Sequence, residues 1–362
     1  MRFLCSILLV LGLSSGADAQ HLAAFHDQRD FFHIFDDGRF LQASVQPVEQ
    51  WTAGFDYLAY VDNRGFLMIY FEGETNEVPV LPSTLHPTRV LLAYSNGGNL
   101  FVLDGDRIRA ADPWFTEMLA TGDSILVYRD RFDRTMVYAS GDTSTRMEEF
   151  GMNIPPKAAA NIVAYTDDFD QLKVWYKPWG YTEVVESSPV RSFDVGDHTV
   201  AYVDNTDIFK VWHRGDVYDL QNERPQGFKA GEDLVAWVDR LGRLVAFYDG
   251  DVYDLLDYRP QWYEVTENLV YYLDDFGNLR LFTEGEKHIL TRYEPAEVRA
   301  DQDILIWPDL DGYIWGWVNG TKSKLTDEIA TSFELSRQAI VYNTNPFVFK
   351  VWSRGTNHRF QQ

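Results

Sequence analysis

Apolar and polar positions along this chain repeat about every 35 residues. In the best-preserved stretch, the apolar run Leu234–Val238 is followed by Asp239, by Gly242 and by a second apolar run. A fixed period of this size indicates a tandem repeat. The aromatic residue near the end of the first apolar run marks the register, at spacings of 34 to 37 residues. These register aromatics are Phe25, Tyr60, Tyr94, Tyr128, Tyr165, Tyr202, Trp237, Tyr272, Trp307 and Tyr342.

Each repeat predicts four short antiparallel strands. The first follows a proline, the second is the apolar run, and the third and fourth resemble Phe209–Trp212 and Val217–Leu220. An Asp-x-x-Gly turn links the second and third strands, and Asp-Gly or Asn-Gly follows the third, which is typical of tight hairpins. Because no stretch carries an apolar stripe of period 3.6, we expect little helix.

The second strands indicate how the sheets pack. A run such as Leu234–Val238 is apolar on both faces, so each sheet must lie between two others. Radial stacking of four-stranded sheets satisfies this requirement, and it is the β-propeller arrangement. In this blade pattern the chain resembles the WD40-like and TolB-like β-propellers of exported bacterial proteins. The resemblance implies the fold and no site residues, because the His and Trp-Asp pairs of WD40 blades and the tryptophan-docking signatures of quinoprotein blades are missing.

The predicted fold class is all-β, a β-propeller of about ten four-stranded repeats. It forms either a single large ring or two five-bladed rings, and the latter would divide the chain into 20–188 and 189–362. The first repeat begins at its second strand. One strand is therefore missing, and the way in which the ring closes does not follow from the sequence.

The N-terminal segment, residues 1–19, has the pattern of a secretory signal peptide. Arg2 precedes the apolar run Phe3–Leu13, and Ala17-Asp18-Ala19 supplies a small-residue cleavage site before Gln20. The apolar run is too short to span a membrane. The only cysteine, Cys5, lies in this segment, so the mature chain contains none. We expect an exported protein, periplasmic or extracellular at the cell surface, with no membrane span.

Charge and composition narrow the function. With 32 Lys and Arg against 55 Asp and Glu, the net charge is −23, which argues against nucleic acid as a partner. Aromatic residues make up 15% of the chain, and the repeat accounts for most of them as one or two core rings in each unit. Their abundance is therefore first a packing feature.

Candidate chemistry is sparse. No catalytic motif occurs, the eight histidines form no metal-binding pair, and no cofactor is predicted. Asp309 and Asp311 faintly resemble a fragment of a Ca²⁺-binding loop, but a full site needs more oxygen ligands, and the chemistry of a hairpin turn is the favoured explanation. The strand after each proline loop, which we expect to line the channel, carries varied residues and does not concentrate acids.

A few residues interrupt the repeat and are candidates for binding a ligand or partner. Trp114 and Phe115 lie in a less regular unit, and Trp179 and Tyr181 occupy a hairpin turn where other units are polar. Exposed aromatics at such places bind sugars or proteins. Arg224 and Arg259 precede prolines at equivalent positions and could attract an anion, although pairing with a neighbouring aspartate such as Asp219 or Asp254 is the favoured interpretation.

These observations predict an exported, non-enzymatic β-propeller that acts as a protein-binding or scaffolding module in the bacterial envelope. Its partner would be an envelope or extracellular protein, or a glycan. The alternative is a carbohydrate-binding or carbohydrate-cleaving propeller.

Overall fold

The computed structural model describes residues 21–148, 152 and 154–360. Within these ranges the chain forms 38 strands and no helix, so no helix there is long and apolar enough to cross a membrane. The predicted signal peptide, residues 1–19, lies outside the described residues. The strands assemble into ten antiparallel units, here called blades 1–10 in chain order.

The first half of the chain forms blades 1–5. Blade 1 contains β1 (Leu22–His26), β2 (Phe32–Asp36) and β3 (Arg39–Ser44); blade 2 contains β4 (Trp51–Ala53), β5 (Tyr57–Val61), β6 (Leu67–Phe71) and β7 (Glu74–Val78); blade 3 contains β8 (Thr84–Pro87), β9 (Leu91–Asn96), β10 (Asn99–Asp104) and β11 (Arg107–Asp112); blade 4 contains β12 (Phe115–Thr121), β13 (Ile125–Asp130), β14 (Thr135–Ala139) and β15 (Thr145–Glu148); blade 5 contains β16 (Lys157–Ala158), β17 (Ile162–Thr166), β18 (Gln171–Tyr176) and the first part of β19 (Tyr181–Val195).

The second half forms blades 6–10. Blade 6 contains the second part of β19, β20 (Thr199–Asp204), β21 (Phe209–His213) and β22 (Asp216–Gln221); blade 7 contains β23 (Gly227–Ala230), β24 (Leu234–Val238), β25 (Leu244–Tyr248) and β26 (Asp251–Leu256); blade 8 contains β27 (Trp262–Val265), β28 (Val270–Leu273), β29 (Leu279–Thr283) and β30 (Glu286–Ile289); blade 9 contains β31 (Arg299–Asp301), β32 (Ile304–Pro308), β33 (Ile314–Val318) and β34 (Thr321–Lys324); blade 10 contains β35 (Ser332–Ser336), β36 (Ala339–Asn345), β37 (Val348–Ser353) and β38 (Thr356–Arg359).

The core lies between the blades. Every residue of the second strand β24 is buried, and its side chains join clusters with the blades on both sides. All residues of the outer strand β34 are exposed, whereas the inner strand β23 is half-buried. The prediction that second strands are buried on both faces is therefore confirmed, and the first strand of each full blade faces the channel.

The predicted turn chemistry is also present. Between the second and third strands of blade 8, Asp274 Oδ1 accepts hydrogen bonds from the backbone N–H groups of Phe276 and Asn278, each at 2.9 Å. Gly277 then adopts a positive φ of 75°. This places the apex residue, Phe276, outside the sheet, because the aspartate alone satisfies the turn amides. We call the turns between second and third strands tip turns, and those between first and second strands inner turns.

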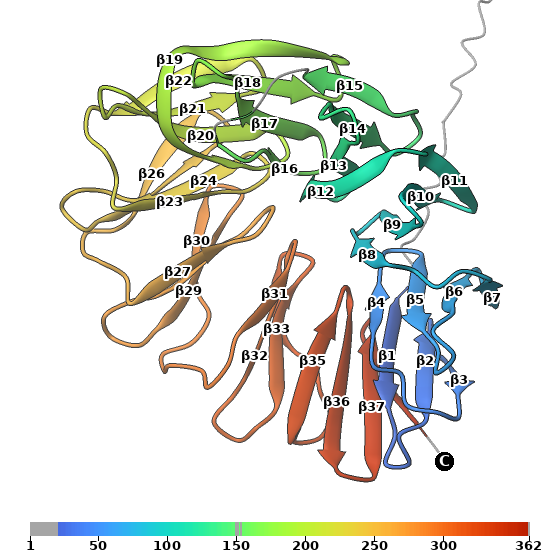
Figure 1. Cartoon of the computed structure of the whole chain (residues 1–362). Helices are drawn as coiled ribbons and strands as arrows, with labels where there is room; N and C mark the ends of the chain where they lie inside the picture. The colour runs from blue at the N-terminus through green and yellow to red at the C-terminus, as the bar shows by residue number, and fades with distance from the viewer. Residues whose placement is uncertain (1–20, 149–151, 153, 361–362) are drawn as a thin grey trace, which may run out of the picture.

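The ten blades close into one ring. The first blade, blue in Figure 1, lies beside the last, red blade, and β1 contacts both β36 of blade 10 and β5 of blade 2. Ser336 Oγ of blade 10 donates to Leu22 O of blade 1 at 3.1 Å. β19 pairs with β18 and with β20, so it joins blades 5 and 6 across position 188. Within the described residues blade 1 has three strands, and the first of them is a second strand, as the sequence predicts.

Candidate functional site

The inner turns converge on the channel and form its mouth on one face of the ring. Backbone hydrogen bonds link neighbouring turns: His198 N donates to Glu232 O at 3.0 Å, and Glu232 N donates to Glu267 O at 2.7 Å. The turns approach so closely that a Cβ added to Gly196 would lie 1.5 Å from Gly231 O. The equivalent central residues of these turns are Phe55, Arg89, Asp123, Ala160, Asp197, Glu232, Glu267, Gln302 and Arg337.

Arg89 reaches across this mouth. Its side chain is 7% exposed, and its Nη1 donates to Asp123 Oδ2 at 2.9 Å and to Glu267 Oε1 at 2.6 Å. Its Nη2 donates to Asp301. One arginine of blade 3 therefore ties together blades 4, 8 and 9, and the channel is narrow at this level.

The mouth holds more negative than positive charge. A cavity of about 260 Å³ is lined by Asp123, Asp197 and Glu267. Burial, reinforced by a hydrogen bond to Asp123, raises the pKa of Glu267 to about 8 despite the charge of Arg89. Burial likewise raises the pKa of Asp197 to about 6. Two of these carboxyl groups are therefore held partly protonated near neutral pH.

The acids of the mouth were missed in the sequence because they lie in turns. The expectation that the inner strands do not concentrate acids says nothing about the residues that follow those strands. The available signal was positional: Asp123, Asp197, Glu232 and Glu267 occupy the same place in four repeats.

A second cluster joins blades 6 and 7 beside the mouth. His198, Glu232 and Asp233 each offer one possible metal-ligand atom, and these three atoms lie within 4.8 Å of one another. Among the described residues, this group could hold a metal ion. Asp233 also accepts from His213 Nε2 at 2.8 Å and from Arg214 Nη2 at 2.6 Å. Although burial alone would raise it, the hydrogen bonds from His198 and His213 and the charges of His198 and Arg214 hold the pKa of Asp233 well below its usual range. The bond to Asp233 in turn raises the pKa of His198. Arg214 thus already supplies a cation to this cluster.

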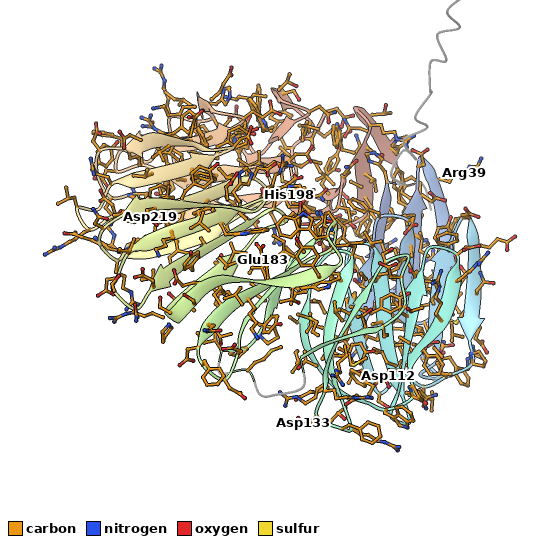
Figure 2. The ribbon with its side chains drawn as sticks, turned by 90° about the horizontal axis from the view of Figure 1, so that it is seen from above. Arg39, Asp112, Asp133, Glu183, His198 and Asp219 are labelled. Carbon is orange, nitrogen blue, oxygen red and sulfur yellow. The ribbon has the colours of Figure 1, made fainter. Side chains whose placement is uncertain are left out.

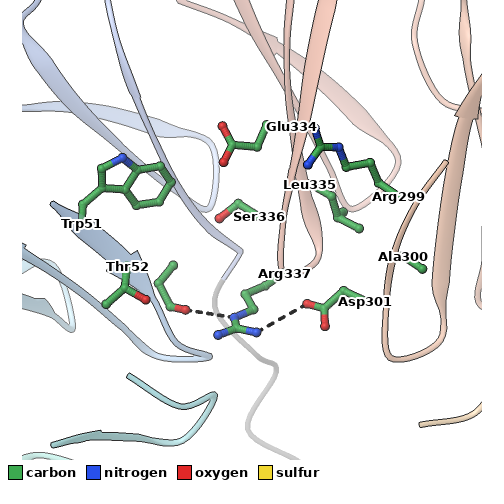
Figure 3. Close-up of a pocket in the computed structure, with 10 residues that line it drawn as sticks. Trp51, Thr52, Arg299, Ala300, Asp301, Glu334, Leu335, Ser336 and Arg337 are labelled. Atoms are coloured by element: carbon green, nitrogen blue, oxygen red, sulfur yellow. Dashed lines mark hydrogen bonds and ion pairs between the residues drawn. The ribbon is translucent and has the colours of Figure 1, made fainter. Parts of the chain in front are cut away.

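A larger cavity, of about 540 Å³, lies between blade 2 on one side and blades 9 and 10 on the other (Figure 3). It is bounded by β4 of blade 2, β31 of blade 9 and β35 of blade 10. Arg337 closes one end, because its Nε donates to Ala53 O at 2.9 Å and its Nη1 lies 3.7 Å from Asp301. The cavity occupies the place where the inner strand of blade 1 would lie.

The opposite face of the ring carries the tip turns and the loops between blades. The loop after β26 packs against a tip turn, since a Cβ on Gly242 would lie 3.4 Å from the Arg259 side chain. In six tip turns an apolar side chain is 52% to 81% exposed. We call this set the crown; its residues are Phe132, Phe169, Leu241, Phe276, Leu310 and Phe347. In Figure 2, Asp133, which follows Phe132, projects from the edge of the molecule, whereas His198 lies toward its middle.

The predicted aromatic residues fall in two separate places. Trp114 lies beside the crown, edge-on to Phe132 with ring centroids 5.3 Å apart, and Phe115 packs inward near Tyr128. Trp179 caps the packing between blades 5 and 6, and Tyr181 stacks on it at 5.5 Å while remaining 56% exposed. The structure therefore does not bring the two pairs into one site.

The predicted charged residues lie on the crown face. Arg224 and Arg259 are exposed in the loops between blades, and neither forms an ion pair with another described residue. Asp309 uses both carboxylate oxygens inside its own turn: Oδ1 accepts from Asp311 N and Oδ2 from Trp315 Nε1, at 3.0 and 2.9 Å. Its part in a Ca²⁺ site stays a prediction.

Comparisons with solved structures find similar folds at low identity. The computationally designed Ika8 protein is 17% identical, with a TM-score of 0.39 over 74% of this chain and 95% of its own. PorZ, a surface component of the type-IX secretion system of Porphyromonas gingivalis, is 11% identical, with a TM-score of 0.29 over 94% of this chain and 58% of its own. Prp20p of Saccharomyces cerevisiae is 10% identical, with a TM-score of 0.37 over 71% and 87%.

No curated protein matches the chain. The sequence model of the 10-bladed beta propeller domain matches residues 16–358, which is almost the whole chain. Ten radially arranged blades in a single ring agree with that match. The chain therefore belongs to the 10-bladed beta propeller domain family.

Proposed function

We propose that this chain is an exported, non-enzymatic propeller that binds another protein of the bacterial envelope through its crown. The observation that carries the proposal is the presence of an exposed apolar side chain in six tip turns on one face. Exposed apolar groups gathered on one face mark protein interaction sites more often than scattered ones do.

The crown residues do not build the turns on which they lie. In blade 5, Asp167 Oδ1 accepts from the backbone N–H of Phe169 and of Gln171, so the turn is complete without the Phe169 ring. That ring is 76% exposed. Equivalent apices in other blades are polar, with Arg29 in blade 1 and Thr206 in blade 6. Burying a phenylalanine or leucine against a partner contributes roughly 1.5–3 kcal/mol.

The location is part of the proposal. The signal-peptide pattern of residues 1–19 and the absence of cysteine from the rest of the sequence support export to a bacterial periplasm or cell surface. Detection of the processed protein in the periplasmic or surface fraction of its host would support this location, and recovery in the cytoplasm would contradict it.

The crown is tested by polar substitution. The multiple variant Phe169→Ser, Leu241→Ser, Phe276→Ser should keep its fold and melting temperature while losing at least tenfold in affinity for a partner identified by cross-linking and confirmed by reciprocal capture. The matched control, Arg29→Ser with Thr206→Ser, changes apices of the same kind of turn and should bind normally. Equal binding by all three proteins would contradict the crown as the interface.

Carbohydrate binding is the second candidate, favoured by the exposed Tyr181 ring stacked on Trp179. Carbohydrate cleavage is supported less, because Arg89 already bonds to Asp123 and Glu267 in the acidic mouth. A glycan array decides between the candidates. Glycan binding that is lost in the Tyr181→Ala variant would favour the carbohydrate function. An array on which no glycan binds would exclude that function.

A further inference from the structure

Blade 1 presents an inner edge that no described strand covers. β1 pairs only with β2. Asp27 N donates to Phe31 O where β1 turns into β2, which sets the alternation of the ladder. Odd-numbered residues of β1 therefore bond to β2, and the backbone N–H and C=O groups of Leu22, Ala24 and His26 point toward the channel.

In the full blades an inner strand takes up these groups. In blade 7, for example, Gly231 N donates to Leu234 O at 2.6 Å, and the ladder continues between β23 and β24. Leu22 is the counterpart of Leu234, and its carbonyl instead accepts from Ser336 Oγ of blade 10 at 3.1 Å. A side chain of the neighbouring blade thus replaces one bond of the missing strand.

A cavity of about 540 Å³ lies between β4 and β35, the two inner strands that both contact β1 (Figure 3). Thr52 of β4 in blade 2 lines one wall of this cavity, and Glu334 of β35 in blade 10 lines the other. Arg299 of β31 in blade 9 also lines the cavity. The cavity is open, and its position is that of an extended segment lying antiparallel to β1.

Charge specifies what would fit there. In each full blade one inner-strand residue lies opposite the position before the register aromatic. In two pairs of neighbouring blades these residues form an ion pair between the blades: Lys157 Nζ with Asp194 Oδ1 at 2.7 Å, and Lys229 with Glu264. Glu334 holds the same position in blade 10. It is exposed, and it makes no hydrogen bond or ion pair with another described residue. A cation opposite Ala24 would lie beside it.

The flanking positions of the inner strands are apolar. In β23 the residues around Lys229 are Phe228 and Ala230, and both pack against the core between blades 6 and 7. An inner strand that supplies the cation of such a pair therefore has three successive residues of fixed kind: an apolar residue, the basic residue and a small apolar residue.

We propose that the inner edge of β1 binds an extended segment of a partner protein, with a lysine or arginine between two apolar residues, which adds to blade 1 as its fourth strand. Main-chain hydrogen bonds to β1 provide affinity, and Glu334 selects the basic residue. The net charge of −23 favours a basic partner as well. The site is separate from the crown, which lies on the tip turns, so either proposal can fail without the other.

The test uses a peptide copied from the inner strand of blade 7, PQGFKAGE, carrying a fluorophore, and the full chain. We expect saturable binding by fluorescence anisotropy. N-methylation at the lysine removes the N–H group that would donate to β1 and should weaken binding at least tenfold. N-methylation at the phenylalanine, whose N–H points away from β1, should change binding less than threefold. Equal effects of the two modifications, or no binding, would overturn the proposal.

Charge reversal locates the site. Glu334→Lys should lower the affinity for the lysine-containing peptide at least tenfold. The same variant should bind more tightly to the peptide in which glutamate replaces lysine. The control Glu286→Gln changes an exposed carboxylate of the outer strand β30 and should bind as the unaltered protein does. Unchanged binding by Glu334→Lys would overturn the assignment. A chain that begins at Gln20, the form expected after export, should bind the peptide as well, and failure of that chain to bind would overturn the proposal.

Discussion

The acidic mouth of the channel should make the stability of this propeller depend on pH through Glu267. The proposed perturbation is Glu267→Gln, which retains the shape of the side chain and an oxygen that accepts from Arg89. In the folded chain the pKa of Glu267 is raised from 4.5 to about 8, chiefly by burial. The unfolded chain therefore releases this proton at lower pH than the folded chain does.

The sign and the size follow from that difference. The folded state binds more protons than the unfolded state between pH 4.5 and about 8, so the free energy of unfolding falls as pH rises through this window. At about 1.4 kcal/mol for each pH unit, the upper limit of the loss is about 5 kcal/mol. Because Asp123 hydrogen bonds to Glu267 and remains in the variant, we expect Glu267→Gln to recover about 1–3 kcal/mol at pH 8.5 and almost nothing at pH 5.

Urea unfolding followed by tryptophan fluorescence measures this effect, since the chain contains 11 tryptophans. The unaltered protein, Glu267→Gln and the exposed control Glu286→Gln are compared at pH 5 and pH 8.5. The control should match the unaltered protein at both values. The electrostatic reasoning is refuted if Glu267→Gln is no more stable than the unaltered protein at pH 8.5, or if its advantage is the same at pH 5.

Two further predictions concern the turns. Gly196→Ala should lower the free energy of unfolding by about 3 kcal/mol, because its Cβ would meet Gly231 O at 1.5 Å. The control Gly320→Ala is strained only by a φ of 71°, so it should lower the free energy of unfolding by about 1 kcal/mol in the same urea assay. Equal losses in the two variants would contradict the clash. Asp274→Ala should cost about 2–4 kcal/mol by thermal unfolding, because it leaves two half-buried turn amides and the Arg280 guanidinium without their acceptor. The substitution of its exposed neighbour, Asp275→Ala, should cost less than about 0.5 kcal/mol. Similar melting temperatures for the two variants would show that Asp274 does not hold the turn.

The repeating parts of the fold could be predicted from the sequence because their causes are local. The register aromatics mark strands that are buried on both faces, and the turn aspartates satisfy amides two and four residues away. The three-stranded first blade also followed from the place of Phe25, the register aromatic of the first repeat, so close to the predicted signal peptide. What the repeat could not determine was the number of rings, because that depends on contacts between distant blades.

The candidate sites were harder to predict, because they depend on contacts over long distances in sequence. Arg89 meets Asp301, 212 residues later, only when ten blades close around one axis. His198 and His213 share Asp233 across a blade boundary, although neither forms a recognisable metal motif in the sequence. Four of the crown residues do recur two residues after a turn aspartate, but exposure is not visible in a pattern where most aromatics belong to the core. Trp179 illustrates the difficulty, because it packs between two blades.

Amide hydrogen exchange of the isolated protein tests most directly whether blade 1 has an open inner edge. The amides of Ala24 and His26 should exchange much faster than those of their counterparts Ala236 and Val238 in blade 7, which bond to the inner strand β23. Addition of the PQGFKAGE peptide should then slow exchange at Ala24 and His26 and leave blade 7 unchanged. Equal protection of the two blades before any peptide is added would contradict the open edge.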